Sequence, residues 1–372
     1  MNFRQKYSII AFSFRSVDFF LLFMLRFGRR SRDSNPPPNL KTPKFEVKSE
    51  FRMQRLITAF KFLTILLLTL LFGSSTTLLQ AQDPSKPYEN SHFVKVDSAT
   101  FHYRIFNDSL EHPRGHVLLV HGFCGSTFCW RNNIEPLVKA GYLVVAIDLP
   151  GFGYSDRNLH VNQSHSSRAK LIWAMLAMID HDATRKWNIV GHSMGAGAIE
   201  AMALTNPDRV QTVTLVDGMV FIRNHNMKGA FITMSKMKGT KQILVSLAQN
   251  NIISYNSMER LMKGVYGRPL DSAEMKGYMA PLYIEGSAAS VINIYANAGE
   301  IRHLHADGLM DLPVLVIWGK KDHTIYLKTA KKLKKNVPTI ELKIIPAAAH
   351  APMETHPEIF NKLLLDFLNT HN

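Results

Sequence analysis

The stretch Ile189-Val190-Gly191-His192-Ser193-Met194-Gly195 decides the fold. An apolar run precedes Ser193 and a helix-like segment follows it, so the serine is expected on a sharp, strained turn between a strand and a helix. Side chains two positions before and after the serine would clash in such a turn, and both of those positions are glycine. The pattern therefore predicts that Ser193 is a nucleophile.

Short runs of Val, Ile and Leu recur along the chain and alternate with helix-like segments. Continuous apolar runs are typical of strands that are buried on both faces of a parallel sheet. This order predicts an α/β fold with a mostly parallel eight-stranded sheet and helices on both faces. The expected strands are 94–96 and 100–106 as an opening hairpin, then 117–120, 143–147, 189–190, 213–216, 314–317 and 342–345. The expected helices are 168–179, 195–204 and one that includes 359–368.

The segment 218–311 interrupts this rhythm, because it is rich in Met and helix-like and has no clear strand. We expect a helical cap there, inserted between the sixth and seventh strands of a core formed by 82–217 and 312–372. Flexible thioether side chains suit an adaptable apolar pocket, and ordinary helix packing is the simpler explanation. From the pocket interpretation we expect a substrate with an apolar acyl or alcohol group. The sequence does not identify that substrate.

A serine hydroxyl needs a base to take its proton and a carboxylate to orient that base. In an α/β fold these groups follow the serine at strand ends, in the order Asp then His. Asp322 follows the expected seventh strand and His350 follows the eighth. We predict a triad of Ser193 as nucleophile, His350 as general base and Asp322 as acid, with Asp217 at the end of the sixth strand as the alternative acid.

With these motifs the chain resembles the α/β-hydrolase family of cap-bearing esterases and their relatives, over roughly residues 92 to 370. The resemblance rests on His121-Gly122-Phe123 with Gly125-Ser126, Asp148 to Ser155, the Ser193 turn, Trp318 to Asp322, and His350 with Pro352-Met353-Glu354. It implies that the backbone N–H groups of Phe123 and Met194 form an oxyanion hole. The chemistry requires no metal and no organic cofactor.

Several positions depart from the family pattern. Cys124 stands where many relatives have Pro or another small residue, so a thiol lies beside the oxyanion loop, for packing or for redox sensitivity. The carbon-carbon bond hydrolases of aromatic degradation often have Asn before the nucleophile and Trp after the histidine, where this chain has His192 and Ala351. Relatives that open epoxides or displace halide use Asp as nucleophile, so Ser193 argues against both reactions.

Residues 53–81 have the plan of a signal peptide, with a basic start, a short apolar run at 62–72 and a small residue, Ala81, before the expected cut. The apolar run is about 11 residues long, whereas a membrane span needs roughly 20. We therefore expect cleavage after Ala81 and a secreted or periplasmic protein, with a membrane anchor as the alternative. Residues 1–52 precede the signal, and we interpret them as a non-native upstream extension with Met53 as the true start.

The positive charge of the chain is concentrated in this leader. Residues 1–81 hold 13 of the 44 Lys and Arg and 4 of the 29 Asp and Glu, so residues 82–372 carry a formal charge of +6. That modest charge, without a basic stripe and interleaved aromatic residues, argues against a nucleic-acid partner.

Other polar residues have simpler roles than catalysis. The short spacing of Cys124 and Cys129 allows either a disulfide or two packed thiols. We expect His192 and His323 to support the site, and His303 and His305 to lie on the cap surface rather than bind metal. Asp148 and Asp156 are interpreted as residues that hold a tight glycine-rich loop and not as catalytic acids.

We predict a serine hydrolase that cleaves an ester or similar acyl bond of a small molecule through an acyl-enzyme. One alternative keeps the triad and changes the bond, to carbon-carbon or amide. Another is a small-ligand-binding protein of the same fold that has lost turnover, against which the intact set of motifs argues.

Overall fold

The computed structural model describes residues 86–158, 160–180, 182–218, 245–246, 248–250, 253–297 and 306–371. The predicted extension 1–52 and signal segment 53–81 lie outside these residues. Every element below belongs to one compact unit of the chain, Ala81–Asn372.

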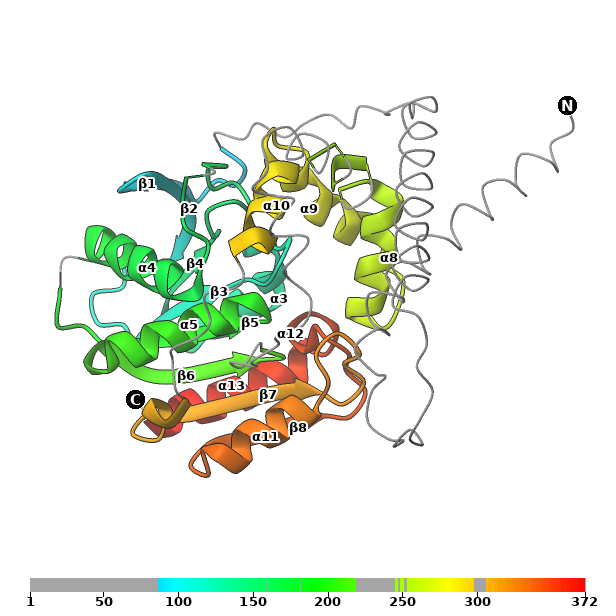
Figure 1. Ribbon diagram of the computed structural model, residues 1–372. Coiled ribbons are helices and arrows are strands. Elements are labelled where there is room, and N and C mark those ends of the chain that lie inside the picture. The colour runs from blue at the N-terminus through cyan, green and yellow to red at the C-terminus, as the bar shows by residue number, and fades with distance from the viewer. Residues whose placement is uncertain are drawn as a thin grey trace, which may run out of the picture. The chain divides into compact units, whose positions relative to one another are not determined.

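Eight strands form a single sheet in the order β1-β2-β4-β3-β5-β6-β7-β8 (Figure 1). The first pairings, β1 with β2 and β2 with β4, are antiparallel, and the remaining pairings are parallel. The strands are β1 (Ser91–Val96), β2 (Ala99–Phe106), β3 (His116–Val120), β4 (Leu143–Ile147), β5 (Trp187–His192), β6 (Val210–Val216), β7 (Val314–Gly319) and β8 (Glu341–Ile345). The predicted fold class is confirmed, including the opening hairpin.

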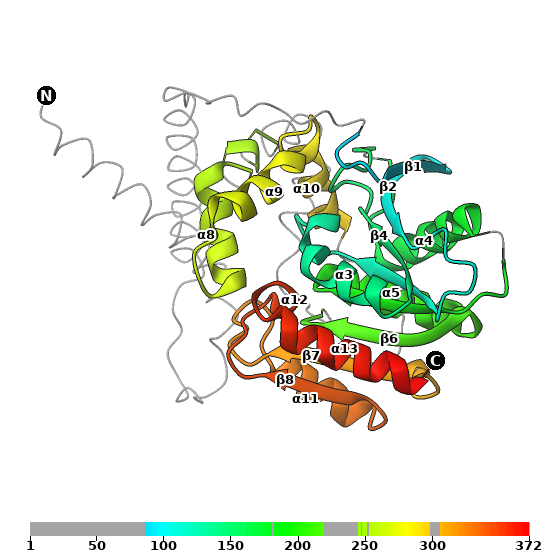
Figure 2. The same cartoon turned by 180° about the vertical axis from the view of Figure 1, so that it is seen from behind.

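Helices cover both faces of the sheet (Figures 1 and 2). One face carries α4 (His165–Ile179), α5 (Met194–Thr205) and α11 (Lys328–Asn336), and the other carries α3 (Arg131–Lys139) and α13 (Pro357–His371). Short helical turns are η1 (Thr127–Trp130), η2 (Pro207–Arg209), η3 (Ala306–Leu309) and α12 (Pro352–Thr355). The inner strands β3 to β7 are buried almost throughout between the two helical layers, which explains their continuous apolar sequences, whereas β8 at the sheet edge is mostly exposed.

Burial is complete or nearly so in the elements that carry the nucleophile, β5 and α5, and in the neighbouring strand β3. All residues of β3 and β5 are buried, as are the residues of α5 from Met194 to Ala203. A helix buried all round needs small side chains where neighbouring chain passes close by. At Gly197 an added Cβ would lie 2.6 Å from the His165 ring, so glycine there lets α4 pack against the helix that carries the nucleophile.

Three described helices lie between β6 and β7, past the carboxyl ends of the parallel strands (Figure 1). They are α8 (Tyr255–Tyr266), α9 (Ser272–Leu282) and α10 (Ser287–Asn297). Met258, Met262 and Tyr266 recur at helical spacing on the buried face of α8, as ordinary helix packing requires. The rest of the predicted 218–311 cap, including Met219, Met227, Met234 and Met237, lies largely outside the described residues.

Candidate active site

Ser193 lies on the turn between β5 and α5 and has left-handed backbone angles, φ 51° and ψ −115°. Such angles are strained for a residue with a side chain. At Gly191, an added Cβ would lie 2.7 Å from the carbonyl oxygen of Gly195. At Gly195, an added Cβ would lie 2.4 Å from the carbonyl oxygen of His121. Both glycines are therefore required by close backbone contacts, and the turn presents the serine at the carboxyl edge of the sheet.

The three predicted triad residues, distant in sequence, meet at this edge. His350 Nε2 lies 3.0 Å from Ser193 Oγ, and His350 Nδ1 lies 2.7 Å from Asp322 Oδ2. A carboxylate only accepts hydrogen bonds, so Nδ1 carries the proton and Nε2 is left to accept the serine hydroxyl. All three side chains are buried, which strengthens electrostatic interactions among them.

Asp322 is held as a carboxylate by the groups around it. Its Oδ1 accepts hydrogen bonds from the backbone N–H groups of Thr324 (2.7 Å) and Ile325 (2.9 Å). Burial disfavours the charged form, but the hydrogen bond and charge of His350, with bonds from Asp217 and Ile325, outweigh burial and lower the pKa of Asp322. Asp322 can therefore orient the His350 ring and stabilise its protonated form.

The backbone of His350 is fixed from two sides. Its N–H donates to the carbonyl of Val265 in α8 at 2.9 Å, and its carbonyl accepts from His192 Nε2 at 2.7 Å. Burial and the neighbouring His350 lower the pKa of His192 to about 3, so His192 is neutral at physiological pH. His192 supports the site by hydrogen bonding, as the sequence predicted.

The loop after β3 runs directly against the nucleophile. At Gly122 an added Cβ would lie 3.0 Å from Ser193 Cβ and 2.9 Å from His192 Nδ1. Phe123 follows on this loop, and Met194 begins α5, in whose first turn N–H groups have no acceptor within the helix. The two predicted oxyanion donors therefore belong to segments that adjoin Ser193.

Asp148 organises the loops beneath this site. Its Oδ1 accepts from Thr127 N–H at 2.6 Å, and its Oδ2 accepts from Tyr154 N–H and lies 2.7 Å from His102 Nδ1. Asp156 similarly accepts from the Thr100 N–H at 2.6 Å. Both aspartates hold loops, in agreement with the sequence-based interpretation.

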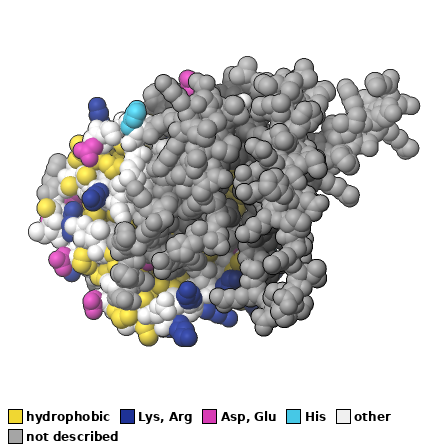
Figure 3. All heavy atoms as spheres, viewed as in Figure 1, with side chains coloured by type: hydrophobic (Ala, Val, Ile, Leu, Met, Phe, Trp, Pro, Cys, Tyr) yellow, Lys and Arg dark blue, Asp and Glu magenta, His cyan; other side chains and the backbone are white. Residues whose placement is uncertain are grey.

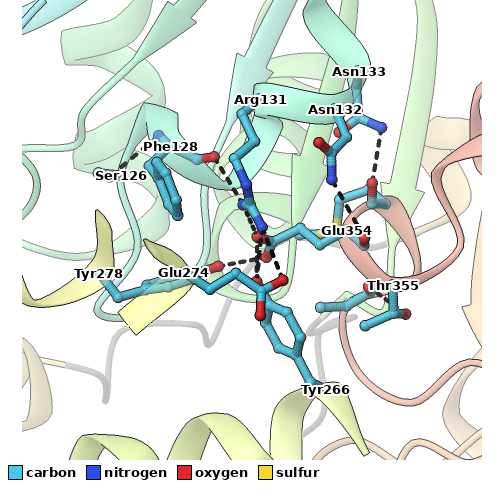
Figure 4. A network of polar contacts seen from close by, with 12 residues as sticks. Ser126, Phe128, Arg131, Asn132, Asn133, Tyr266, Glu274, Tyr278, Glu354 and Thr355 are labelled. Carbon is cyan, nitrogen blue, oxygen red and sulfur yellow. Dashed lines mark hydrogen bonds and ion pairs between the residues drawn. The ribbon is translucent and has the colours of Figure 1, made fainter. Parts of the chain in front are cut away.

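A buried polar network that the sequence analysis missed surrounds Glu354 (Figure 4). The Glu354 carboxylate accepts hydrogen bonds from Arg131, Tyr266 and Tyr278, and Arg131 also pairs with Glu274 at 3.4 Å. These residues come from the core on one side and from α8 and α9 on the other. The feature of the sequence that could have indicated this network is Glu354 itself, which is the one charged residue in the stretch 351–354 that follows His350.

Arg131 and Glu354 shift each other's pKa in this network. Burial raises the pKa of Glu354, although Arg131, Tyr266 and Tyr278 all oppose that rise. The Arg131 guanidinium has its own pKa raised, because Glu354 and Tyr266 outweigh its burial. An ion pair with added tyrosine hydrogen bonds therefore joins the helices after β6 to the segment that carries His350.

Both cysteines are free and buried. Cys124 has a left-handed backbone, φ 55°, and burial raises the pKa of its thiol to about 12. A thiol with so high a pKa forms little of the reactive thiolate. The structure agrees with two packed thiols.

Within the described part of the chain, one group of three or more His, Cys, Asp and Glu residues is close enough to hold a metal, and it consists of Asp217, Asp322 and His350. Two ligands about 2.1 Å from a tetrahedral ion lie roughly 3.4 Å apart. The 2.7 Å between Asp322 and His350 is too short for that and fits a hydrogen bond. His323 is exposed, and His303 and His305 lie outside the described residues.

The visible surface of the described residues has mixed charge. Figure 3 shows Lys, Arg, Asp and Glu side chains scattered among hydrophobic and uncharged ones on the coloured part of that face. Among the helices that the structure describes, none has both the length and the apolar character needed to cross a membrane.

Residues 115–357 match the sequence model of the family described as alpha/beta hydrolase fold. The chain belongs to the α/β hydrolase family. Its strand order and the position of Ser193 between β5 and α5 agree with that membership. The predicted resemblance is therefore confirmed, and the chain is a hydrolase.

Proteins that are similar to this hydrolase in sequence or in structure carry different names. A 2-hydroxy-6-oxononadienedioate/2-hydroxy-6-oxononatrienedioate hydrolase 1 of Pseudomonas putida is 26% identical over 294 residues, which are 76% of this chain and 98% of that protein. A 2-hydroxy-6-oxo-6-phenylhexa-2,4-dienoate hydrolase of Burkholderia cepacia is 27% identical over 266 residues, 68% of this chain and 87% of the relative. The structure of an esterase from Exiguobacterium antarcticum is similar, with a TM-score of 0.59 and 16% sequence identity. The similarity covers 74% of this chain and 98% of the esterase chain.

Proposed function

We propose that this hydrolase cleaves an ester or similar acyl bond of a small molecule, with Ser193 as nucleophile. The observation that carries the proposal is the hydrogen-bonded row Asp322–His350–Ser193, which ends on a strained turn beside the Gly122 loop. A nucleophile, a base and an orienting carboxylate within hydrogen-bond distance are the parts that acyl transfer requires.

In the first half of the reaction, Ser193 Oγ attacks the carbonyl carbon while His350 Nε2 takes the hydroxyl proton. Asp322 keeps the ring in the required tautomer and stabilises the imidazolium. The carbonyl oxygen becomes an oxyanion, for which the Phe123 and Met194 N–H groups are the proposed donors. Each such donor is typically worth about 2.7–4 kcal/mol of barrier.

The tetrahedral intermediate then collapses. His350 returns the proton to the leaving alcohol oxygen, the bond to that oxygen breaks, and the acyl group remains on Ser193. Water enters, His350 takes its proton, and a second oxyanion forms and collapses to release the carboxylic acid. Ser193 regains its proton from His350, so the cycle consumes one water and needs no cofactor.

A second candidate is hydrolysis of a carbon-carbon bond with the same residues. The names of the two relatives describe substrates with ketone, enol and carboxylate groups but no ester, so hydrolysis of those substrates must break a bond between carbons. Sequence identity over most of both chains favours this candidate. His192 and Ala351 depart from the pattern that such enzymes often show, so we place the acyl bond first. Amide cleavage stays a third possibility, since it uses the same proton transfers.

Active-site labelling tests the proposal. Purified protein is treated with a fluorophosphonate and its intact mass is measured, beside Ser193→Ala as a matched control. We expect one adduct that the variant lacks. No adduct on folded protein would contradict an activated serine and would favour a ligand-binding protein of this fold.

A substrate panel separates the bonds. Nitrophenyl esters of increasing chain length, the matching anilides and a 2-hydroxy-6-oxo-dienoate are compared at equal enzyme concentration. We expect the highest kcat/KM on an ester, and an apolar acyl chain is expected to help. A higher kcat/KM on the dienoate would replace the acyl proposal with the carbon-carbon one.

We also propose that residues 53–81 direct export and that the mature chain begins at Gln82. Membrane attachment would follow if the segment is retained. Amino-terminal sequencing of protein isolated from its natural host, in both soluble and membrane fractions, tests this. A natural precursor beginning at Met1 would contradict the interpretation of 1–52 as an extension.

A further inference from the structure

A second aspartate, Asp217, lies beside the triad at the end of β6. Its side chain is fully buried, and its backbone is left-handed with φ 41°. Its N–H donates to the Ile317 carbonyl at 3.0 Å, and its Oδ1 accepts from the Gly319 N–H at 3.0 Å. These bonds fix the carboxyl group between the ends of β6 and β7.

The Asp217 carboxyl group also lies close to the triad residues. Oδ2 is buried and receives no N–H or hydroxyl hydrogen bond from a described residue. The carboxyl group of Asp217 lies near that of Asp322, and both side chains are buried. Asp217, Asp322 and His350 each offer an oxygen or nitrogen, and these atoms all lie within 4.8 Å of one another.

Two carboxylates this close in a buried site cannot both be ionised, so they share one proton. Asp322 has His350 and the N–H groups of Thr324 and Ile325 to stabilise a negative charge, whereas Asp217 has the single N–H of Gly319. Burial and the charge of Asp322 raise the pKa of Asp217 well above its usual range. The shared proton therefore belongs to Asp217.

We propose that Asp217 is a positioning residue that donates a hydrogen bond from its protonated carboxyl group to Asp322, and that it replaces Asp322 as the acid partner of His350 when Asp322 is removed. The inference rests on the proposed function, since it assigns a role in the same triad. The hydrogen bond donated by Asp217 keeps the Asp322 carboxylate oriented so that its Oδ2 accepts a hydrogen bond from His350 Nδ1.

The reserve role follows from electrostatics. Without Asp322, the Asp217 carboxyl loses the neighbouring negative charge that disfavours its ionisation. It can then release its proton and form an ion pair with protonated His350, a ring nitrogen of which lies within 4.8 Å of a carboxyl oxygen of Asp217. Asparagine at position 217 can still donate a hydrogen bond to Asp322, but it cannot carry a negative charge.

Two substitutions at position 217 test the donor role on an ester substrate of the wild-type enzyme. Asp217→Ala is expected to lower kcat by about 10-fold or more with little change in KM. The substitution removes the hydrogen bond to Asp322, which helps to stabilise the transition state and does not contact the substrate. Asp217→Asn is expected to recover most of that loss, within about 3-fold of wild type. A loss in Asp217→Asn as large as in Asp217→Ala would overturn the donor role.

The reserve role is tested in the background of Asp322→Ala. We expect the added Asp217→Asn substitution to lower kcat by at least about 10-fold there, far more than in the wild-type background. A merely structural role would give equal losses in both backgrounds, and that result would overturn the inference. Fluorophosphonate labelling rates of the same proteins give a second readout that does not depend on substrate choice.

Two controls keep the outcomes distinct. Failure of wild type to label would refute the proposed function, whereas labelling of wild type with equal rates in Asp322→Ala and its Asp217→Asn double variant would refute only the inference. If Asp217→Ala does not fold, infrared difference spectra of the isosteric Asp217→Asn against wild type decide the protonation state. A carboxylic-acid carbonyl band that is present in wild type and absent in the variant is expected, and its absence from wild type would overturn the inference.

Discussion

At the scale of single residues, the site depends on glycines and on buried acids that only their surroundings explain. Gly195 has room for hydrogen alone, because an added Cβ would overlap a backbone oxygen of the β3 loop. Gly264, in α8, has nothing within 4 Å of the same hypothetical atom. One glycine is required by close packing and the other is not.

We therefore expect opposite results from the same substitution. Gly195→Ala should abolish serine labelling and lower the free energy of unfolding, since the backbone must shift. Gly264→Ala should raise the free energy of unfolding by about 0.5–1 kcal/mol, the usual gain of alanine over glycine in a helix. Urea denaturation with labelling rates checks both, and a stable, labelled Gly195→Ala protein would contradict the tight turn.

Glu200 in α5 gives a prediction about pH. Its side chain is fully buried, both carboxylate oxygens lack partners among the described residues, and burial raises its pKa well above the usual range. A raised pKa in the folded state means that unfolding releases a proton, so the contribution to stability is present below the unfolded pKa of about 4.3 and is lost as pH rises.

Glu200→Gln should therefore stabilise the protein more at pH 8 than at pH 5. We expect Tm to rise at pH 8 by at least about 3 °C, the shift that 1 kcal/mol produces in a domain of this size. Melting curves at both pH values measure it, with the exposed Glu285→Gln as control. A gain independent of pH would show that Glu200 is ionised in the folded protein.

At the scale of elements, two kinds of contact join the helices after β6 to the core. His350 donates its backbone N–H to Val265 in α8, and the Glu354 network spans α3, α8, α9 and α12 (Figure 4). These helices therefore help to fix the general base as well as cover the strand ends.

Arginines in this network differ in how much they contribute. Arg131 pairs with the buried Glu354, whereas Arg268 pairs with Glu274 and has 47% of its side chain exposed. Arg131→Met should lower the free energy of unfolding by about 3 kcal/mol, because it leaves a buried carboxylate without its partner. Arg268→Met, the matched control, should cost less than about 1 kcal/mol. Equal losses in denaturant titrations would contradict the importance of burial here.

At the scale of the whole molecule, the sheet, the helices after β6 and all proposed site residues belong to the unit Ala81–Asn372. We therefore expect a chain that begins at Gln82 to match the full chain in Tm and in fluorophosphonate labelling rate. Differential scanning calorimetry and intact-mass labelling of the two chains measure this. A truncated chain that does not fold, or labels much more slowly, would contradict it.

Local sequence was enough to predict the eight strands, three of the helices and the three residues proposed as the triad. Apolar runs, the glycines around Ser193 and the positions of Asp322 and His350 after strands all depend on short-range rules of backbone geometry and strand topology. The α/β hydrolase fold followed from their order, and the structure brings Ser193, Asp322 and His350 together.

Tertiary structure alone decided the pairings between distant segments. Asp217 could be weighed against Asp322 as the acid, but only the sheet brings their carboxyl groups within 4.8 Å of each other, as the proposed sharing of a proton requires. Arg131 and Glu354, separated by 223 positions, likewise gave no local signal of their ion pair. Side-chain burial and charge coupling depend on which segments the fold brings into contact. The spacing of residues along the chain does not give the distance in space between those segments.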